Sequence, residues 1–319
     1  MKKRIELKSR LTLAAALLGV VLSGCASEGK SPDNNAQGIP SDKLKVMASI
    51  YPVYDFAVKV GGDKVTVTNM VPAGTEPHDW EPGTDDIIGL EKADVFVYSG
   101  AGMEHWAEDV LKSLANKDLA VAEASEGITL REGRSEEEEA GKAAEDSHDP
   151  HVWLDPMNAK KEMENIKNAF VKADPENKNY YESNYKIYGE KLDALNQSYK
   201  DALSPFSGKT IVVSHEAFGY LCGAYGLTQM GIEGLIPDSE PNPAQMAKIV
   251  DFIKENKVET IFFEALGTSK VIDVISKETG ARAAALNPIE GLSDEEIKAG
   301  DDYFSIMEAN LEALKRALE

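Results

Sequence analysis

The stretch PENKNYYESNYKIYGEKLDALNQSYKDALS, residues 175–204, decides the architecture that this sequence predicts. Its apolar and aromatic residues recur at steps of three and four, at Tyr185, Tyr188, Leu192, Leu195, Tyr199 and Leu203. This spacing places them on one face of a long α-helix. Asp174-Pro175 is a typical helix start, and Ser204-Pro205 is a typical end. We therefore predict a single long helix that divides the chain into two halves.

Short strand-like segments alternate with helical segments on both sides of this helix. Before it, we predict strands in LKVMASI (44–50), KVTVTNMV (64–71) and DVFVYSG (94–100), and helices over 51–60, 85–92 and 157–172. After it, we predict strands in TIVVSH (210–215), LTQMGIEGL (227–235), VETIFFE (258–264) and ARAAALN (281–287), and helices over 243–255 and 303–318. Such alternation is typical of βαβ units. The predicted fold is α/β, with two lobes (44–174 and 205–319) that each hold a mostly parallel sheet and are joined by the rigid helix 175–204.

The N-terminus has the pattern of an export signal. A charged segment, MKKRIELKSR, precedes an apolar run, 11–24, that is too short to span a bilayer as a helix. The run ends in Leu22-Ser23-Gly24-Cys25, which resembles a bacterial lipobox, although an ordinary signal with a chance cysteine is the alternative. We predict that residues 1–24 are a lipoprotein signal peptide and that 25–43 are a lipidated flexible tether. A lipid on Cys25 would hold the protein on the outer face of the cytoplasmic membrane.

Charge and cysteine content limit the remaining possibilities. The formal net charge of the 319-residue chain is −21, which argues against nucleic acid and anionic lipid as partners and favours either solubility or the gathering of cations. Once Cys25 carries a lipid, Cys222 is the only cysteine with a free thiol, so we expect no intrachain disulfide in the mature chain. Because Cys222 lies in an apolar run, we expect it to be a buried small hydrophobic residue.

Three of the five histidines occupy places that suit a binding site. His78 lies in the proline-bounded loop EPHDWEP after a predicted strand, and His151 lies in the proline-bounded loop DPHVWLDP. His215 lies in VVSHEAFGY, at the carboxyl end of an apolar strand, where open α/β sheets bind their ligands. Three imidazoles and one carboxylate would form a tetrahedral shell suited to zinc.

The fourth ligand has two candidates. Glu264 ends the strand segment IFFE, and Glu290 lies in LNPIEG, so both follow strands of the second half. Asp79 and Glu216 adjoin two of the histidines and are either hydrogen-bond partners of the ligands or solvated carboxylates.

An acidic run, SEEEEAGKAAED (135–146), precedes DPHVWLDP. We assign His148 and Asp149 to this acidic approach, with at best an accessory part in binding, and place the boundary of the site at Pro150. The run either solubilises the chain or concentrates zinc weakly.

Enzyme motifs are absent from the sequence. HExxH, GxSxG, a P-loop and a GxGxxG after a strand do not occur. We therefore predict a binding protein rather than an enzyme. A secreted zinc hydrolase is the alternative, and Glu216 or Glu264 would be its only plausible general base.

The lipobox, EPHDWEP, DPHVWLDP, SHEAFGYL, FFEALGTSKV and LNPIEGL follow one another in an order that resembles the zinc-uptake substrate-binding lipoproteins of bacterial ABC importers, the cluster A-I metal-binding family. The resemblance covers residues 44–319. It implies two lobes joined by one rigid helix, with the metal in the cleft between them. His78, His151 and His215 match the family's histidine ligands. Manganese members usually have a glutamate at the third position, so His215 favours zinc.

The family resemblance also bears on the fourth ligand. Asn287 stands where many members have an aspartate, and asparagine is a poor zinc ligand. Other members use a glutamate at the position of Glu290, so we prefer Glu290, with Glu264 or a water as alternatives.

The resemblance implies a monomeric carrier that binds Zn²⁺ as transported ligand and delivers it to an ABC permease and its ATPase. A manganese or iron carrier of the same family is the alternative. Cell adhesion is a role associated with such lipoproteins, and this sequence has no feature of its own for it.

Overall fold

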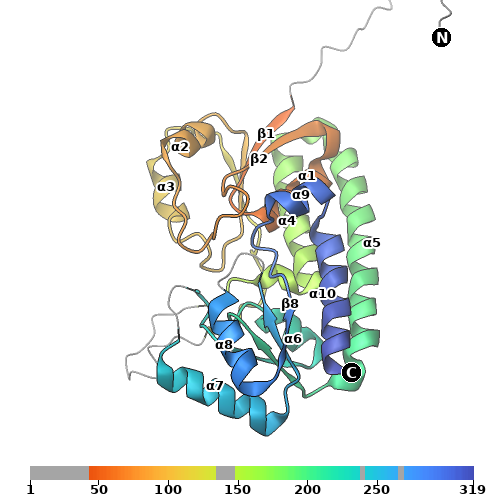
Figure 1. Ribbon diagram of the computed structural model, residues 1–319. Coiled ribbons are helices and arrows are strands. Elements are labelled where there is room, and N and C mark those ends of the chain that lie inside the picture. Colours follow the sequence, from red (N-terminus) through yellow and green to blue (C-terminus); the bar gives the residue numbers. More distant parts are fainter. Residues whose placement is uncertain (1–42, 134–147, 238–240, 265–268) are drawn as a thin grey trace, which may run out of the picture. The chain divides into compact units, whose positions relative to one another are not determined.

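Two parallel β-sheets of four strands each organise the described part of the chain (Figure 1). The first holds β1 (Leu44–Ala48), β2 (Val65–Asn69), β3 (Val95–Tyr98) and β4 (Ala120–Glu123), in the spatial order β2-β1-β3-β4. The second holds β5 (Thr210–Val213), β6 (Thr228–Gly231), β7 (Thr260–Phe263) and β8 (Arg282–Ala285), in the spatial order β6-β5-β7-β8. All of these strand pairs are parallel, and the two sheets repeat one topology. The predicted two-lobe α/β fold is confirmed.

The computed structural model describes residues 43–133, 148–237, 241–264 and 269–319. Residues 42–319 form one compact unit. The predicted signal peptide, Cys25 and most of the acidic run lie outside the described residues.

The helices lie between and after these strands in the sequence. In the first half they are α1 (Tyr51–Gly61), α2 (Thr84–Leu90), α3 (Ala107–Ser113) and α4 (Pro156–Ala173). The long helix is α5 (Lys178–Leu203). The second half adds α6 (Gly219–Tyr225), α7 (Pro243–Asn256), α8 (Ser269–Thr279), α9 (Asp294–Ala299) and α10 (Tyr303–Leu318). The sequence pattern predicts no range for β4, α3, α6, α8 or α9, although α6 and α8 lie between predicted strands, where the alternation of strands and helices favours a helix.

The long helix is shorter at both ends than the sequence predicts. Residues Pro175–Asn177 and Ser204–Phe206 form 3₁₀ turns that flank α5. Proline has no N–H for an α-helical hydrogen bond, so each turn marks the limit of the helix. The prediction that 175–204 separates two α/β halves is unaffected by this change.

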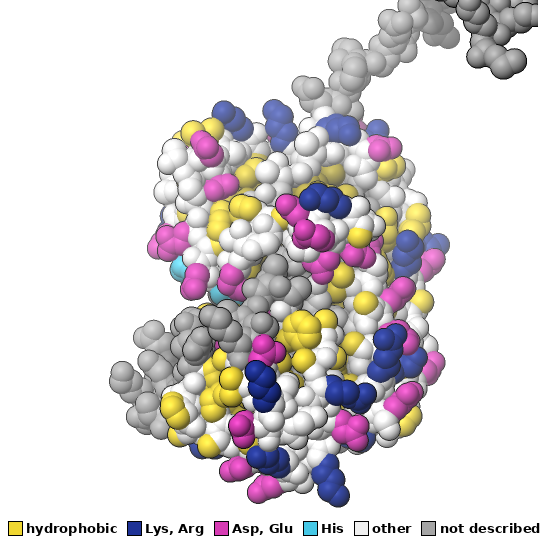
Figure 2. Space-filling model, viewed as in Figure 1, with side chains coloured by type: hydrophobic (Ala, Val, Ile, Leu, Met, Phe, Trp, Pro, Cys, Tyr) yellow, Lys and Arg dark blue, Asp and Glu magenta, His cyan; other side chains and the backbone are white. Residues whose placement is uncertain are grey.

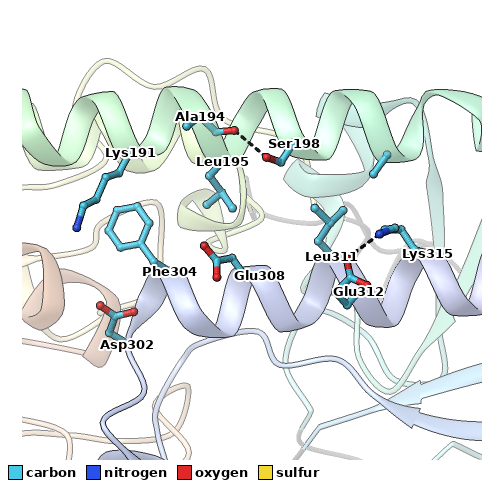
Figure 3. Close-up of a pocket in the computed structure, with 11 residues that line it drawn as sticks. Lys191, Ala194, Leu195, Ser198, Asp302, Phe304, Glu308, Leu311, Glu312 and Lys315 are labelled. Atoms are coloured by element: carbon cyan, nitrogen blue, oxygen red, sulfur yellow. Dashed lines mark hydrogen bonds and ion pairs between the residues drawn. The ribbon is translucent and has the colours of Figure 1, made fainter.

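Helices α5 and α10 run side by side and connect the two halves (Figure 1). Tyr199 on α5 is fully buried, and its hydroxyl donates to the backbone oxygen of Met307 on α10 at 2.6 Å. Between the helices lies a groove of about 720 Å³, whose apolar lining includes Leu195 of α5 and Leu311 of α10 (Figure 3). Helix α5 also contacts α1 and α4 of the first half and α6 of the second half.

Further bonds join the two halves away from this edge. The indole Nε1–H of Trp153 donates to the backbone oxygen of Pro288 at 2.7 Å, and the hydroxyl of Tyr303 donates to the backbone oxygen of Trp153 at 2.7 Å. Lys59 on α1 bonds both Asp55, at 2.6 Å, and Asp302, the residue that caps α10, at 2.8 Å. The loop before α4, which carries Trp153, is therefore bonded both to the loop after β8 and to the start of α10.

The core of the described residues includes a buried carboxyl group, that of Glu162. Both carboxylate oxygens of Glu162, on α4, lack a hydrogen-bond partner among the described residues, and the side chain is fully buried. Burial, together with the charge of Glu104, raises the pKa of Glu162 well above its usual value. A carboxyl group with a raised folded-state pKa makes the fold less stable as the pH rises above the unfolded-state pKa.

Glu162→Met should therefore stabilise the metal-free protein. We expect a gain of about 1–3 kcal/mol in the free energy of unfolding at pH 8, the usual cost of an unsatisfied buried polar group. The gain should shrink towards pH 5, where the protonation of Glu162 in the wild type costs less free energy. Urea denaturation at both pH values measures it, with Glu164→Met on the same helix as control. No gain at pH 8 would contradict this account of Glu162.

Candidate metal centre

Four buried side chains converge where the two halves meet. They are His78, His151, His215 and Glu290, and their ligand atoms all lie within 4.8 Å of one another. Nε2 of His151 lies 3.3 Å from Nε2 of His78 and 3.4 Å from Nε2 of His215. Oε1 of Glu290 lies 2.8 Å from Nε2 of His151, 3.1 Å from Nε2 of His215 and 3.5 Å from Nε2 of His78. Each half of the chain contributes two of the four.

These separations fit a tetrahedral metal ion. A zinc ion with bonds of about 2.0–2.1 Å to four ligands sets adjacent ligand atoms roughly 3.3 Å apart. The five separations above, 2.8 to 3.5 Å, lie around that value. Three imidazole nitrogens and one carboxylate oxygen are also a donor set that suits zinc. The residues present could therefore hold a zinc ion.

The loop after β2 fixes the position of His78. The backbone N–H of His78 donates to Oε1 of Glu76 at 3.2 Å, and a turn joins the N–H of Trp80 to the backbone oxygen of Pro77. Burial, and then the charge of Glu290, raise the pKa of Glu76. Glu76 is therefore a further carboxyl group close to the centre, which the sequence pattern did not single out.

Asp149 has a different role from the one its sequence suggests. It is buried, at 3% exposed, and its Oδ1 accepts hydrogen bonds from the backbone N–H and from Nδ1 of His151, at 3.0 and 2.8 Å. The assignment of Asp149 to the acidic approach was wrong, because tertiary contacts bury a residue that directly follows a polar run. A carboxylate on Nδ1 fixes the ring and leaves Nε2 free for a metal. The boundary falls between His148 and Asp149.

Glu264 contacts Nδ1 of His215 and is not one of the four clustered ligands. Its Oε1 lies 2.7 Å from Nδ1 of His215 and also accepts from the hydroxyl of Ser214. Glu290 instead approaches Nε2, on the opposite side of the ring. The geometry thus separates the two carboxylates that the sequence left as alternatives, one at each nitrogen of His215.

The remaining candidates are not members of the four-residue cluster. Asp79 and His148 are exposed, and Glu216 is half-buried. His148 pairs through its backbone with Glu132. Cys222 is buried, as predicted, and burial raises the pKa of its thiol to about 12.

The electrostatics of the centre favour an ionised carboxylate. Burial alone would raise the pKa of Glu290, but the charge of His215 and hydrogen bonds with His151, His215 and His78 outweigh it. The pKa of Glu290 therefore lies well below its usual range. The side chain is an anion that a buried cation or bound protons must compensate.

The pKa values of two of the histidines, His151 and His215, shift in the opposite direction. Burial lowers the pKa of His151, but hydrogen bonds with Asp149 and Glu290 more than reverse this, and the pKa is raised. Burial also lowers the pKa of His215, and the charges of Glu290 and Glu264 raise it well above its usual value. Without metal, the centre therefore retains protons that a metal ion must displace.

Comparison with protein families bears on what this centre binds. The model described as "Zinc-uptake complex component A periplasmic" matches residues 46–317. The chain belongs to this family. The predicted resemblance is thus confirmed, and so is the prediction of a transport component rather than an enzyme.

Relatives and solved structures agree with the family. The chain is 42% identical over 310 residues, 96% of both proteins, to the high-affinity zinc uptake system protein ZnuA of Bacillus subtilis. It is 38% identical over 311 residues to the zinc-binding lipoprotein AdcA of Streptococcus pneumoniae, of which it covers 60%. The Zn(II)-bound ZnuA-like domain of that AdcA is 38% identical, with 86% of this chain and 99% of the domain covered and a TM-score of 0.75. The laminin-binding protein Lmb of Streptococcus agalactiae is 33% identical, with 87% and 100% covered and a TM-score of 0.77.

The raised histidine pKa values generate a prediction for the metal-free protein. His151 and His215 should titrate above about 6.5, the value of a free imidazole, in a histidine NMR titration. Their raised pKa values stabilise the metal-free fold below that pH, and this contribution is lost as the pH rises through the folded-state values. Zinc should abolish both titrations. Two histidines that titrate below 6.5 would contradict the described electrostatics.

Proposed function

We propose that this protein is the extracytoplasmic solute-binding component of an ABC importer, which captures Zn²⁺ and delivers it to a membrane permease. The observation that carries the proposal is the set of four buried donor atoms at tetrahedral spacing. Membership of the zinc-uptake family and the Zn(II)-bound state of a relative support it. The permease and its ATPase are the partners of the same proposal.

The proposed ligands are His78, His151, His215 and Glu290. An arriving hydrated ion would exchange its waters for three Nε2 atoms and one carboxylate oxygen, while the histidines release protons. Because the first two residues belong to one half and the last two to the other, a bound ion would cross-link the halves. Acidic side chains alternate with lysines and arginines over the visible face of the molecule, where little histidine reaches the surface (Figure 2). The net charge of the whole chain, −21, would attract cations.

The donor set argues against a manganese carrier and against a zinc hydrolase. A manganese site favours carboxylate and water oxygens, whereas three of the four donors here are imidazoles. A zinc hydrolase keeps one coordination position open for water, and the four donors would fill a tetrahedral shell. Glu264, a candidate base in that alternative, is bonded to Ser214 and His215.

We further propose the organisation of the whole chain. Residues 1–24 are a lipoprotein signal, 25–43 a tether lipidated at Cys25, 44–174 and 205–319 the two metal-binding lobes, and 175–204 the linking segment. The protein would then act as a monomer anchored to the outer face of the cytoplasmic membrane. Among the described residues, no helix is long and apolar enough to cross a membrane.

Zinc calorimetry on residues 26–319, which include the whole compact unit, tests both function and ligands. We expect one tight site in the wild type. Glu264→Gln should weaken it about 10–100-fold, as loss of an orienting partner does. Glu290→Gln should weaken it further, because a ligand is removed. Glu312→Gln, in an exposed ion pair on α10, serves as control. A wild type without tight zinc binding would reject the function, and full affinity in Glu290→Gln would reject that ligand.

Zinc affinity should also depend strongly on pH. Below the raised pKa values of His151 and His215, each proton that zinc displaces lowers the affinity about tenfold per pH unit. With one or two protons displaced, we expect the affinity to fall about 10–100-fold per unit as the pH drops below those values. Titrations at pH 7 in buffers of different ionisation enthalpy count the released protons. Zinc binding without proton release would contradict the prediction.

A further inference from the structure

The segment that carries His151 rests on a helix of the other half of the chain. The hydroxyl of Tyr220, on α6, donates to the backbone oxygen of Asp149 at 3.0 Å and accepts from the backbone N–H of Arg131 at 2.9 Å. The N–H of Asp149 in turn donates to the backbone oxygen of Arg131 at 3.0 Å. One hydroxyl thus holds two chain segments that lie on either side of the acidic run in sequence.

The surroundings of Tyr220 hold its side chain in place. Tyr220 is 5% exposed, and the guanidinium of Arg131 lies over its ring, 5.9 Å from the ring centroid. Burial is the main cause that raises the pKa of Tyr220 to about 12. The O–H therefore remains protonated, and able to donate, at every physiological pH.

The effect of Tyr220 reaches His151 through a single residue. Asp149, whose backbone Tyr220 holds, bonds both the backbone N–H and Nδ1 of His151 through Oδ1. Nε2 of the same ring belongs to the four-atom cluster. A shift of Asp149 would disturb this ring, because a carboxylate on Nδ1 fixes the orientation of the imidazole.

The neighbouring glycine shows how closely Asp149 approaches α6. A Cβ atom at Gly219 would lie 2.4 Å from Oδ2 of Asp149, which is closer than real Cβ contacts allow. Any side chain at this position would displace the carboxylate that orients His151. At Gly223, one turn later, a Cβ would meet the guanidinium end of Arg131 at 2.6 Å, and that flexible end can move aside.

We propose that Tyr220 and Gly219 are positioning residues for His151, so that α6 of the second half sets the geometry of a zinc ligand supplied by the first half. The inference rests on the proposed zinc-binding function. It extends that function to two residues that are not metal ligands. They act through the contact between α6 and the backbone of Asp149.

The test compares Tyr220→Phe with Tyr225→Phe in residues 26–319. Tyr225 lies on the same helix, is 6% exposed, and donates its hydroxyl to Oδ1 of Asn196 at 3.2 Å, away from the centre. Each variant loses one buried hydroxyl, so their losses in Tm should be similar. Only Tyr220→Phe should weaken zinc binding, by about tenfold, the lower end for an outer partner of a ligand. Zinc calorimetry and thermal unfolding of the metal-free proteins provide the two measurements.

The glycine pair supplies a second, independent comparison. Gly219→Ala should weaken zinc binding at least as much as Tyr220→Phe, whereas Gly223→Ala should leave it unchanged. Wild-type zinc affinity in both Tyr220→Phe and Gly219→Ala would overturn the inference while leaving the proposed function intact. A wild type that does not bind zinc would overturn both.

Discussion

The architecture depends on one cluster of buried charge. Glu290 shares an oxygen with three imidazoles in a place from which water is nearly excluded, and such an arrangement is stable only if the anion is compensated. Protons on the histidines or a divalent cation can compensate it. The surrounding structure positions these groups. His78 and His215 follow strand ends, and the carboxylates of Asp149 and Glu264 fix the rings of His151 and His215.

The two halves contribute to the centre in equivalent ways. Their sheets have the same strand order, and His78 and His215 each follow a strand at the carboxyl edge of its sheet. The other two members, His151 and Glu290, lie in loops that Trp153 ties together through its bond to Pro288. A change in the relative position of the halves would therefore disturb all four donors together.

Much of this could be predicted from the sequence, and the exceptions have a common cause. The period of apolar residues located α5, and the placement of three histidines at strand ends or between prolines located the centre. Local patterns could not separate Glu264 from Glu290, because both follow strands and only the three-dimensional path decides which nitrogen of His215 each one meets. Asp149 was misassigned for the same reason, since its burial depends on Tyr220 and Gly219, about seventy residues away in sequence.

The bonds that join the halves have a consequence for the discrimination of metals. Trp153, Tyr303 and the packed pair α5 and α10 join the elements that carry the donor atoms. Bonds of this kind oppose an expansion of the four-donor shell. An ion such as Mg²⁺ that demands six oxygen ligands would have to force the loops apart. Selectivity would thus come as much from the stiffness of the scaffold as from the chemistry of its donors.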